Sequence, residues 1–401
     1  MKRILFVDDE PLILAGLQNL LRKHRKVWDM VFVDTGEKAL AKLAESPFDV
    51  IVSDMRMPGM DGATLLKKVQ EKYPNIVRIV LSGHAELETA LRSVSVAHQF
   101  LAKPCDATTL QGVVDRACGL QALLNDDAIR KAVGTIGKLP SAPKVYAAVT
   151  RALEDPDSSL KDIAQLIERD MAIAAKVLQL VNSAFFGLPQ RVGNVQQALS
   201  YLGASMIRRV LLSVETFSMF EGGKAPGSFS IEQLQTHSNA VASVASKLVT
   251  GEPRSSDAFM AGTLHDVGKL ILAVHVPEHF QRAMALASER KIPLFEAEKE
   301  LFGVTHAEVG AYLLGIWGLP YSIVEAVAHH HAPTRVDHAV FDVLDAVYVA
   351  EALVSEASKA SKTSVAPPHF DSAYLAAFGV ESKLPAWRET VAAVMTSIGS
   401  G

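Results

Sequence analysis

Four apolar stretches near the start of the sequence each lead into a side chain with an acidic, hydroxyl or amino group. The most informative is Val50 to Val52, which leads into Asp54 and then into the turn residues Pro58 and Gly59. Such an apolar run is typical of a buried parallel strand, so we expect Asp54 at the carboxyl edge of a sheet, where open α/β proteins place their ligands. Taken alone, an aspartate at a strand end could equally form an Asx turn.

Acidic residues also follow the first apolar stretch, Lys2 to Val7. Asp8, Asp9 and Glu10 come directly after it, before Pro11 begins an amphipathic helical pattern. At one sheet edge, Asp8, Asp9 and Asp54 would repel one another unless a hard divalent cation neutralised them. Mg2+, which prefers oxygen ligands and keeps several of its waters, fits that requirement.

A hydroxyl and an ammonium group complete the set. The stretch from Ile76 to Leu81 leads into Ser82, and the stretch from Gln99 to Ala102 leads into Lys103. A carboxylate that accepts a phosphoryl group becomes a dianionic species, which Mg2+, a lysine and a hydroxyl donor stabilise by charge-assisted hydrogen bonds. Individually, Ser82 could cap a helix and Lys103 could be a solvated charge, but their joint placement at strand ends favours a phosphoryl site.

In this order, Asp8-Asp9, Asp54, Ser82 and Lys103-Pro104 resemble the receiver domain of bacterial two-component response regulators, over about the first 120 residues. The resemblance implies that Asp54 is the phosphoacceptor and that a sensor histidine kinase is the partner that phosphorylates it. It also implies the remaining roles, which are Mg2+ binding by Asp8, Asp9, Asp54 and the main-chain carbonyl of Arg56, phosphoryl binding by Lys103, and switching by Ser82 and Phe100.

The composition is that of a globular protein with more than one domain. The chain has 401 residues, of which 49% are hydrophobic and 21% charged, with a net charge of -4, so we expect two or three domains. The basic footprint of a nucleic-acid-binding protein is missing, and direct DNA binding is not expected. Two cysteines are too few for a disulfide framework, and no signal peptide or apolar run of about 18 residues is evident. We therefore expect a cytoplasmic protein without a membrane span.

Strand and helix patterns alternate over residues 1–120, which predicts an α/β domain with a five-stranded, parallel, doubly wound sheet. The expected strands lie near Lys2, Val31, Val50, Val77 and Gln99. A helix that begins near Ala107 carries its apolar stripe past the domain edge, so we expect a helical linker over residues 121–135. The stripe either packs on its own sheet or serves signalling or homodimer formation.

Helical patterns dominate from Ile136 onward. They predict an all-helical domain over residues 136–401, with its core in residues 136–355 and a C-terminal extension. Pro140 and Pro143 indicate a turn at its start. Predicted helices include residues 204–220 and residues 255–274.

Histidines and acids are the candidate chemical groups of this helical part. Imidazole and carboxylate ligands together suit divalent metals, and an open coordination position would let a metal activate water against a phosphodiester. This interpretation requires several helices to converge; otherwise the histidines are core or capping residues. The candidates are His237, His265, Asp266, His306, His329, His330, His331 and, as the last acid, Glu351 or Asp345.

The order of these residues resembles the HD superfamily of metal-dependent phosphohydrolases, and a wider set of motifs resembles the HDOD domain, an HD-related output module, over about residues 135–355. The motifs are Leu139-Pro140 to Pro143, Val181-Asn182-Ser183-Ala184-Phe185-Phe186-Gly187, Ala198-Leu199-Ser200-Tyr201-Leu202-Gly203, His265-Asp266-Val267-Gly268-Lys269, Thr305-His306-Ala307-Glu308-Val309-Gly310 and His330-His331-Ala332-Pro333. The HDOD resemblance implies a signalling or interaction output that acts on downstream proteins, without an established common reaction.

Two features depart from a full hydrolase pattern. Glu351 stands where HD enzymes use aspartate, and no Gly-Tyr-Pro signature follows His331. The extra methylene of glutamate displaces the carboxylate by about one bond length, on the order of 1.5 Å, and a misplacement of about 1 Å can remove two orders of magnitude in rate. We therefore expect a relic or a weak site, at which a transition metal is a second candidate cofactor beside the Mg2+ of the receiver domain.

The sequence thus predicts a response regulator with an HDOD interaction output. Phosphorylation of Asp54 would draw Ser82 and Phe100 inward and alter the surface that meets the linker or the output domain. The alternative is a phosphorylation-gated, metal-dependent HD phosphohydrolase that acts on a nucleotide or cyclic dinucleotide. A transcription factor is disfavoured because a basic recognition helix is missing.

Overall fold

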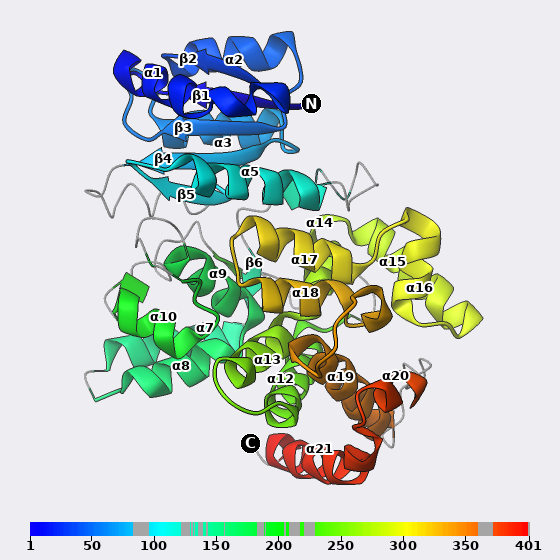
Figure 1. The fold of residues 1–401 in the computed structure, drawn as a ribbon. Helices are drawn as coiled ribbons and strands as arrows, with labels where there is room; N and C mark the ends of the chain where they lie inside the picture. The colour runs from blue at the N-terminus through cyan, green and yellow to red at the C-terminus, as the bar shows by residue number, and fades with distance from the viewer. Residues whose placement is uncertain are drawn as a thin grey trace.

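The computed structural model describes residues 1–82, 96–121, 129, 131, 133–134, 139–141, 143–155, 157–182, 188, 190–203, 206–207, 217–219, 229–359 and 372–399. In Figure 1 a parallel sheet with its helices lies at one end of the molecule, and a helical part continues from it to the C-terminal helices at the other end. No helix within the described residues is both long enough and apolar enough to span a membrane.

The amino-terminal sheet has five parallel strands in the order β2-β1-β3-β4-β5. Its central strands, β1, β3 and β4, are buried almost throughout, as expected when apolar and β-branched residues are covered on both faces. The predicted five-stranded parallel α/β fold is therefore confirmed. The elements are β1 (Lys2–Val7), α1 (Pro11–Leu20), η1 (Arg22–Lys26), β2 (Trp28–Val33), α2 (Gly36–Glu45), β3 (Val50–Asp54), α3 (Gly62–Lys72), β4 (Val77–Ser82), β5 (Gln99–Ala102) and α5 (Ala107–Gln121).

The rest of the described chain is mostly helical, as predicted. Its elements are β6 (Leu139–Ser141), α7 (Pro143–Glu154), α8 (Leu160–Glu168), α9 (Met171–Val181), α10 (Val195–Leu202), β7 (Phe217–Met219), α12 (Ile231–Leu248), α13 (Arg254–Leu264), α14 (Val267–His275), α15 (Pro277–Arg290), α16 (Leu294–Phe302), α17 (His306–Ile316), α18 (Tyr321–His329), η3 (Pro333–Arg335), α19 (Val343–Lys359), α20 (Ser372–Ala377), η4 (Glu381–Lys383) and α21 (Leu384–Gly399).

A small sheet corrects the expectation that this part is all helical. β6 and β7 pair in parallel, with Leu139 opposite Phe217 and Ser141 opposite Met219. β6 lies where a turn was predicted, and β7 lies inside the predicted helix 204–220. The pairing joins segments far apart in the sequence, so local periodicity could not show it. Pro140 is tolerated in β6 because each strand of a two-stranded sheet has an unpaired edge.

The predicted helix over residues 255–274 is two helices, α13 and α14, which break at His265 and Asp266. Asp266 has φ -101° and ψ 9°, outside helical geometry, and begins α14 as its N-cap residue. Side-chain interactions of these two residues, described below, hold them at the break. The interruption of an apolar segment by its most polar residues therefore marks a helix boundary.

A capping box fixes the start of α17. The Thr305 side chain accepts a hydrogen bond from the Glu308 amide, and the Glu308 side chain accepts one from the Thr305 amide. This satisfies amide groups that the first turn of a helix otherwise leaves unpaired. His306 is consequently held as the first helical residue of α17.

The sheet and the helical part are in contact through β5 and α5. Helix α5 packs against α17, as Figure 1 shows. The Gln99 side-chain amide donates to the carbonyl oxygen of Ile316 at 2.7 Å. The guanidinium of Arg78, which is fully buried, donates to the carbonyl oxygen of Gly134 at 2.8 Å. The contact surface therefore belongs to the packed interior of the molecule.

Candidate functional site

The acidic edge of the sheet brings three of the predicted residues into direct contact. Asp54 is the last residue of β3, Asp8 follows β1, and Lys103 follows β5. The Lys103 ammonium nitrogen lies 2.7 Å from Asp8 Oδ2 and 2.6 Å from Asp54 Oδ1. Burial disfavours the charge of Lys103, but its hydrogen bonds to Asp54 and Asp8 raise its pKa above the ordinary value. Lys103 therefore stays a cation beside two carboxylates.

The loop after β3 holds the Asp54 carboxylate in place. The Arg56 amide donates to Asp54 Oδ2 at 2.9 Å, and the Gly62 amide donates to the Met55 carbonyl at 2.9 Å. A Cβ atom on Gly62 would lie 2.1 Å from the Asp54 carbonyl oxygen, so only glycine permits this close approach. The turn after Asp54 thus returns directly onto the strand end.

The other predicted residues of this edge lie at neighbouring strand ends. Asp9 follows Asp8 and is half-buried, while Phe100 on β5 is buried. Ser82 is the last residue of β4 and pairs in register with Ala102, but its side chain lies outside the described residues. Carboxylate oxygens such as those of Asp8, Asp9 and Asp54 are the kind of ligand that Mg2+ prefers, and in this structure Asp8 and Asp54 are paired with Lys103.

A second cluster, in the helical part, brings together the predicted histidines and Glu351. Its first group consists of Asp266, His306, His330 and His331, and its second consists of His237, His265 and Glu351. They come from the α13–α14 break and from α12, α17, α18 and α19, or the residues just after them. Five parts of the chain therefore converge, as the metal interpretation required.

The ring nitrogens and carboxylate oxygens of the cluster lie close to one another. His306 Nε2 lies 3.3 Å from Asp266 Oδ1 and 2.9 Å from His331 Nε2. Glu351 Oε2 lies 2.6 Å from His237 Nε2 and 3.3 Å from His265 Nε2. His265 Nε2 also lies 3.4 Å from Asp266 Oδ2, so His265 and Asp266 join the two groups.

Hydrogen bonds at the outer ring nitrogens orient three of the histidines. Nδ1 of His265 donates to the Gly262 carbonyl at 2.7 Å, and Nδ1 of His330 donates to the Val327 carbonyl at 2.9 Å. His306 Nδ1 donates to Glu298 Oε2 at 2.7 Å. Each bond places a proton on Nδ1 and turns Nε2 toward the cluster, the orientation of metal-binding histidines.

Buried polar atoms without a hydrogen-bond partner lie at the centre of the cluster. They are Nε2 of His265, Oδ1 of Asp266 and Nε2 of His330. A buried polar atom without a partner is costly. A divalent metal in the first group would satisfy Asp266 Oδ1 and His330 Nε2, and one in the second group would satisfy His265 Nε2. The residues present therefore fit a transition metal with mixed nitrogen and oxygen ligands.

Asp345 lies outside both metal-ligand groups, whereas Glu298, which the sequence did not indicate, contacts one of them. Asp345, the alternative to Glu351, binds His338 Nε2 at 2.9 Å and accepts a hydrogen bond from Tyr374, away from either metal-ligand group. Glu298 was not foreseen, although it is fully buried and binds both the amide and the ring of His306. A glutamate on an amphipathic helix ordinarily indicates solvent, so no local signal distinguishes Glu298 in the sequence.

Comparison with known families identifies two domains. The response regulator receiver domain family matches residues 4–115, and the HDOD domain family matches residues 139–333. The chain carries a receiver domain followed by an HDOD domain. This combination indicates a two-component response regulator, as the sequence predicted.

The relatives include regulators and uncharacterized proteins. A protein of Treponema pallidum described as uncharacterized is 29% identical over 49% of this chain, and the hydrogenase transcriptional regulatory protein HoxA of Cupriavidus necator is 36% identical over 31% of it. The matched stretches span 38% and 25% of those two proteins.

Two solved structures are also similar. The signal receiver domain of an HD domain-containing protein from Pseudomonas fluorescens is 31% identical, with a TM-score of 0.29, and the match covers 30% of this chain and 97% of that one. An HDOD domain protein of unknown function from Geobacter sulfurreducens is 22% identical, with a TM-score of 0.37, and the match covers 71% of this chain and 99% of that one.

Electrostatics in the HDOD cluster favour the ionisation state of a metal ligand at Asp266, His330 and His331, and oppose it at His265 and His306. Burial alone would raise the pKa of Asp266, but the Lys269 ammonium, with Nζ at 2.6 Å, and His265 hold it well below the ordinary value. Burial lowers the pKa of His330 to about 3 and that of His331 well below the ordinary value. Burial disfavours charge on His265 and His306, but Asp266 raises the pKa of His265 to about 10 and Glu298 raises that of His306. The cluster therefore places an anionic carboxylate beside two neutral and two cationic imidazoles, and a metal would have to displace a proton from each of the latter two.

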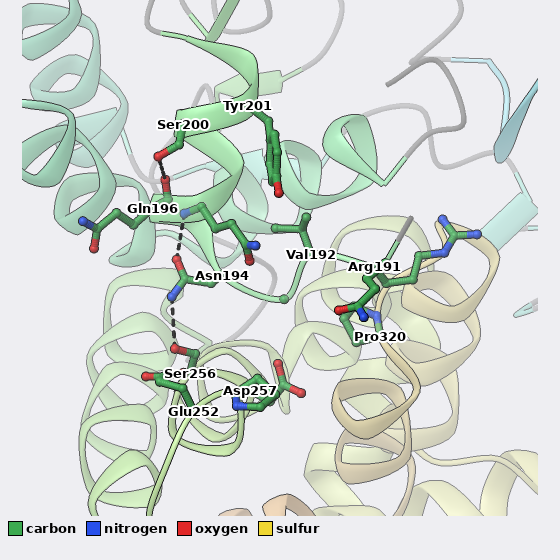
Figure 2. Close-up of a pocket in the computed structure, with 14 residues that line it drawn as sticks. Arg191, Val192, Asn194, Gln196, Ser200, Tyr201, Glu252, Ser256, Asp257 and Pro320 are labelled. Atoms are coloured by element: carbon green, nitrogen blue, oxygen red, sulfur yellow. Dashed lines mark hydrogen bonds between the residues drawn. The ribbon is translucent and has the colours of Figure 1, made fainter. Parts of the chain in front are cut away.

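The HDOD domain also has a pocket of about 790 Å3, which none of the predicted site residues lines. Figure 2 shows it between α10, the start of α13 and Pro320. Asn194 begins α10 as its N-cap and donates to Ser256 Oγ at 3.1 Å across the pocket wall. Its lining mixes amides, hydroxyls, Arg191 and the carboxylates of Glu252 and Asp257, without a dominant charge or apolar surface that would select one ligand class.

Proposed function

We propose that this response regulator is phosphorylated on Asp54 by a sensor histidine kinase and signals through its HDOD domain to a downstream protein. The contact of the Lys103 ammonium with both Asp8 and Asp54, at 2.7 and 2.6 Å, carries this proposal. It places a fixed positive charge where the oxygens of a transferred phosphoryl group would come. The expectation that the protein acts in the cytoplasm stays a prediction.

In the proposed reaction a carboxylate oxygen of Asp54 attacks the phosphorus atom of the kinase phosphohistidine. The new P–O bond forms as the P–N bond breaks, and the histidine leaves. Lys103 binds the phosphoryl oxygens, and the Arg56 amide, at 2.9 Å from Asp54 Oδ2, keeps the carboxylate oriented. Asp8, Asp9, Asp54 and the Arg56 carbonyl would hold Mg2+, which supplies charge neutralisation for the phosphoryl group.

Acetyl phosphate with Mg2+ tests this assignment, with intact-mass spectrometry as the readout. We expect the wild-type chain to gain one phosphoryl group and Asp54→Asn to gain none. Asp34→Asn is the matched control, because Asp34 is also a receiver carboxylate but pairs with Lys38 near the surface. Equal modification of wild type and Asp54→Asn would contradict the assignment.

A second candidate function is that of a metal-dependent phosphohydrolase, and the unpartnered buried atoms His265 Nε2, Asp266 Oδ1 and His330 Nε2 favour it. Asp266, His306, His330 and His331 would hold one metal ion, and His237, His265 and Glu351 a second. Bound metal would supply Lewis acidity and an activated water. Glu351 reaches both of its histidines despite its extra methylene, so the argument for a weak site from side-chain length loses force.

Metal content tests the second candidate directly. We expect the purified protein to bind Mn2+, Fe2+ or Ni2+, and His265→Ala and Asp266→Asn to lose that binding. His24→Ala is the control, because His24 stacks on Trp28 in the receiver domain. Turnover of cyclic dinucleotides or nucleoside phosphates that disappears in the two cluster variants would establish the hydrolase. Binding without turnover would leave the HDOD domain as a metal-containing interaction module.

A further inference from the structure

Helix α17 connects the receiver contact to the HDOD cluster. It runs from His306 to Ile316, and its eleven residues span about 16 Å at 1.5 Å per residue. Ten of the eleven residues are buried, so α17 cannot shift or rotate without changing the packing at both ends. A helix packed on all sides transmits displacement as a unit, because close-packed interiors do not deform continuously.

The C-terminal end of α17 is held by the receiver domain. The Gln99 side chain of β5, which is 5% exposed, donates to the Ile316 carbonyl at 2.7 Å and so satisfies one of the carbonyl groups that a helix end leaves unpaired. A Cβ atom on Gly318 would lie 2.6 Å from Gln99 Nε2, and Gly318 has φ +78°. Glycine at this position therefore allows the receiver side chain to approach the helix end.

The N-terminal end of α17 is part of the metal-ligand group. His306 is its first residue, with Nε2 at 3.3 Å from Asp266 Oδ1 and at 2.9 Å from His331 Nε2. Helix α14 approaches closely here, since a Cβ atom on Gly268 would lie 1.9 Å from the His306 carbonyl oxygen. A small movement of α17 along its axis would change how His306 meets Asp266.

We propose that α17 couples the receiver domain to the HDOD cluster, so that phosphorylation of Asp54 changes the metal affinity of the His306 group through Gln99 and Ile316. The starting point lies on the same sheet, because β5 carries Phe100 beside Gln99 and continues into Lys103, which contacts Asp54. The coupling rests on the proposed metal-binding function of the cluster. By linkage, metal at the cluster changes the affinity of the receiver domain for a phosphoryl mimic by the same factor.

The test measures Mn2+ binding to the full chain by calorimetry, with saturating Mg2+ in every sample to occupy the receiver site and with beryllofluoride present or absent. We expect beryllofluoride to change the Mn2+ dissociation constant by about tenfold, within the range of typical allosteric couplings. Gln99→Ala removes the contact to Ile316 and should keep the basal Mn2+ affinity while losing the beryllofluoride effect. Gln111→Ala, a glutamine on α5 that bonds Asp115 in the same domain, should behave as wild type.

Hydrogen exchange gives a readout that does not require metal. We expect beryllofluoride to alter amide exchange in residues 306–317 of the wild type and of Gln111→Ala, and not of Gln99→Ala. If Mn2+ does not bind, the metal function fails, and the exchange of α17 still decides the coupling. Unchanged exchange in α17 of the wild type, or an equal response in Gln99→Ala, would overturn the proposal.

Discussion

Lys176 offers a quantitative test of the packing inside the HDOD domain. Its side chain is fully buried on α9, and its ammonium lies 4.2 Å from the centre of the Trp317 ring and 3.1 Å from Gln179 Oε1. Burial lowers its pKa from 10.5 to about 7. We predict that Lys176→Met stabilises the protein at neutral pH, because methionine keeps the unbranched stem and removes the buried charge.

The size of the effect follows from proton linkage. One pKa unit is about 1.36 kcal/mol, so a lysine that titrates near 7 rather than 10.5 destabilises the folded state by about 4 to 5 kcal/mol at or below neutral pH. Loss of the hydrogen bond to Gln179 leaves a buried acceptor unpaired and costs about 1 to 3 kcal/mol. A net gain of about 2 kcal/mol is therefore expected for Lys176→Met.

The lowered pKa of Lys176 also predicts the direction in which stability changes with pH. Between pH 7 and 10.5 the unfolded chain keeps the Lys176 proton and the folded chain has lost it, so the stability of the wild type rises with pH across that window. The lysine-dependent part of this rise should be missing in Lys176→Met. The stability of the wild type should therefore approach that of the variant as pH rises above 7 and exceed it before pH 10.5.

Urea unfolding followed by far-ultraviolet circular dichroism at several pH values measures both effects. Lys161→Met on α8 is the control, because Lys161 is exposed and should change neither stability nor its pH dependence. A Lys176→Met variant that is destabilised by several kcal/mol, with the same pH dependence as wild type, would refute the reasoning. It would mean that Lys176 stays charged and well solvated in the folded protein.

Three further predictions concern close contacts and a pH-dependent pair. Gly268→Ala places a Cβ atom 1.9 Å from the His306 carbonyl oxygen, so it should lower the melting temperature and weaken Mn2+ binding measured by calorimetry. Gly62→Ala meets the last carbonyl of β3 at 2.1 Å and should slow modification by acetyl phosphate in a mass-spectrometric time course. Burial disfavours the charge of His338, but the Asp345 hydrogen bond raises its pKa above the ordinary 6.5; this stabilisation is present below that pH and lost as pH rises through the folded value. Asp345→Asn should therefore remove a stability gain that thermal melts detect at acidic pH and not at alkaline pH.

The placement of Asp8, Asp54 and Lys103 at one sheet edge could be predicted from the sequence because all three lie at strand ends. Asp8, Asp54 and Lys103 each follow an apolar stretch, and parallel strands bring their carboxyl ends to one edge. The convergence of the HDOD histidines was foreseen only as a requirement of the metal interpretation, and its geometry depends on tertiary packing. Local sequence carries no information on the pairing of β6 with β7, or on the contact of Glu298 with His306, since both join segments through space.

The break between α13 and α14 and the contact of Gln99 could not be predicted from the sequence either, because both depend on contacts made in the folded chain. The break between α13 and α14 occurs in a segment whose periodicity suits one helix, and it is the side-chain interactions of His265 and Asp266 that favour two. Gln99 reads as an ordinary strand residue until the helix end that it meets is known. Sequence patterns predict a feature that depends on one helix or strand alone. They do not predict a feature that depends on the element packed against it.

The packing of α5 against α17 has a consequence for self-association. A homodimer that used the same face of α5 would have to displace α17, so the contact within one chain and the contact between two chains would exclude each other. The first is independent of protein concentration, whereas the second is favoured by mass action as concentration rises. Dilution would then favour the monomer in which α5 packs against α17. A higher local concentration of the protein would favour the dimer in which α5 has separated from α17, without any change in phosphorylation.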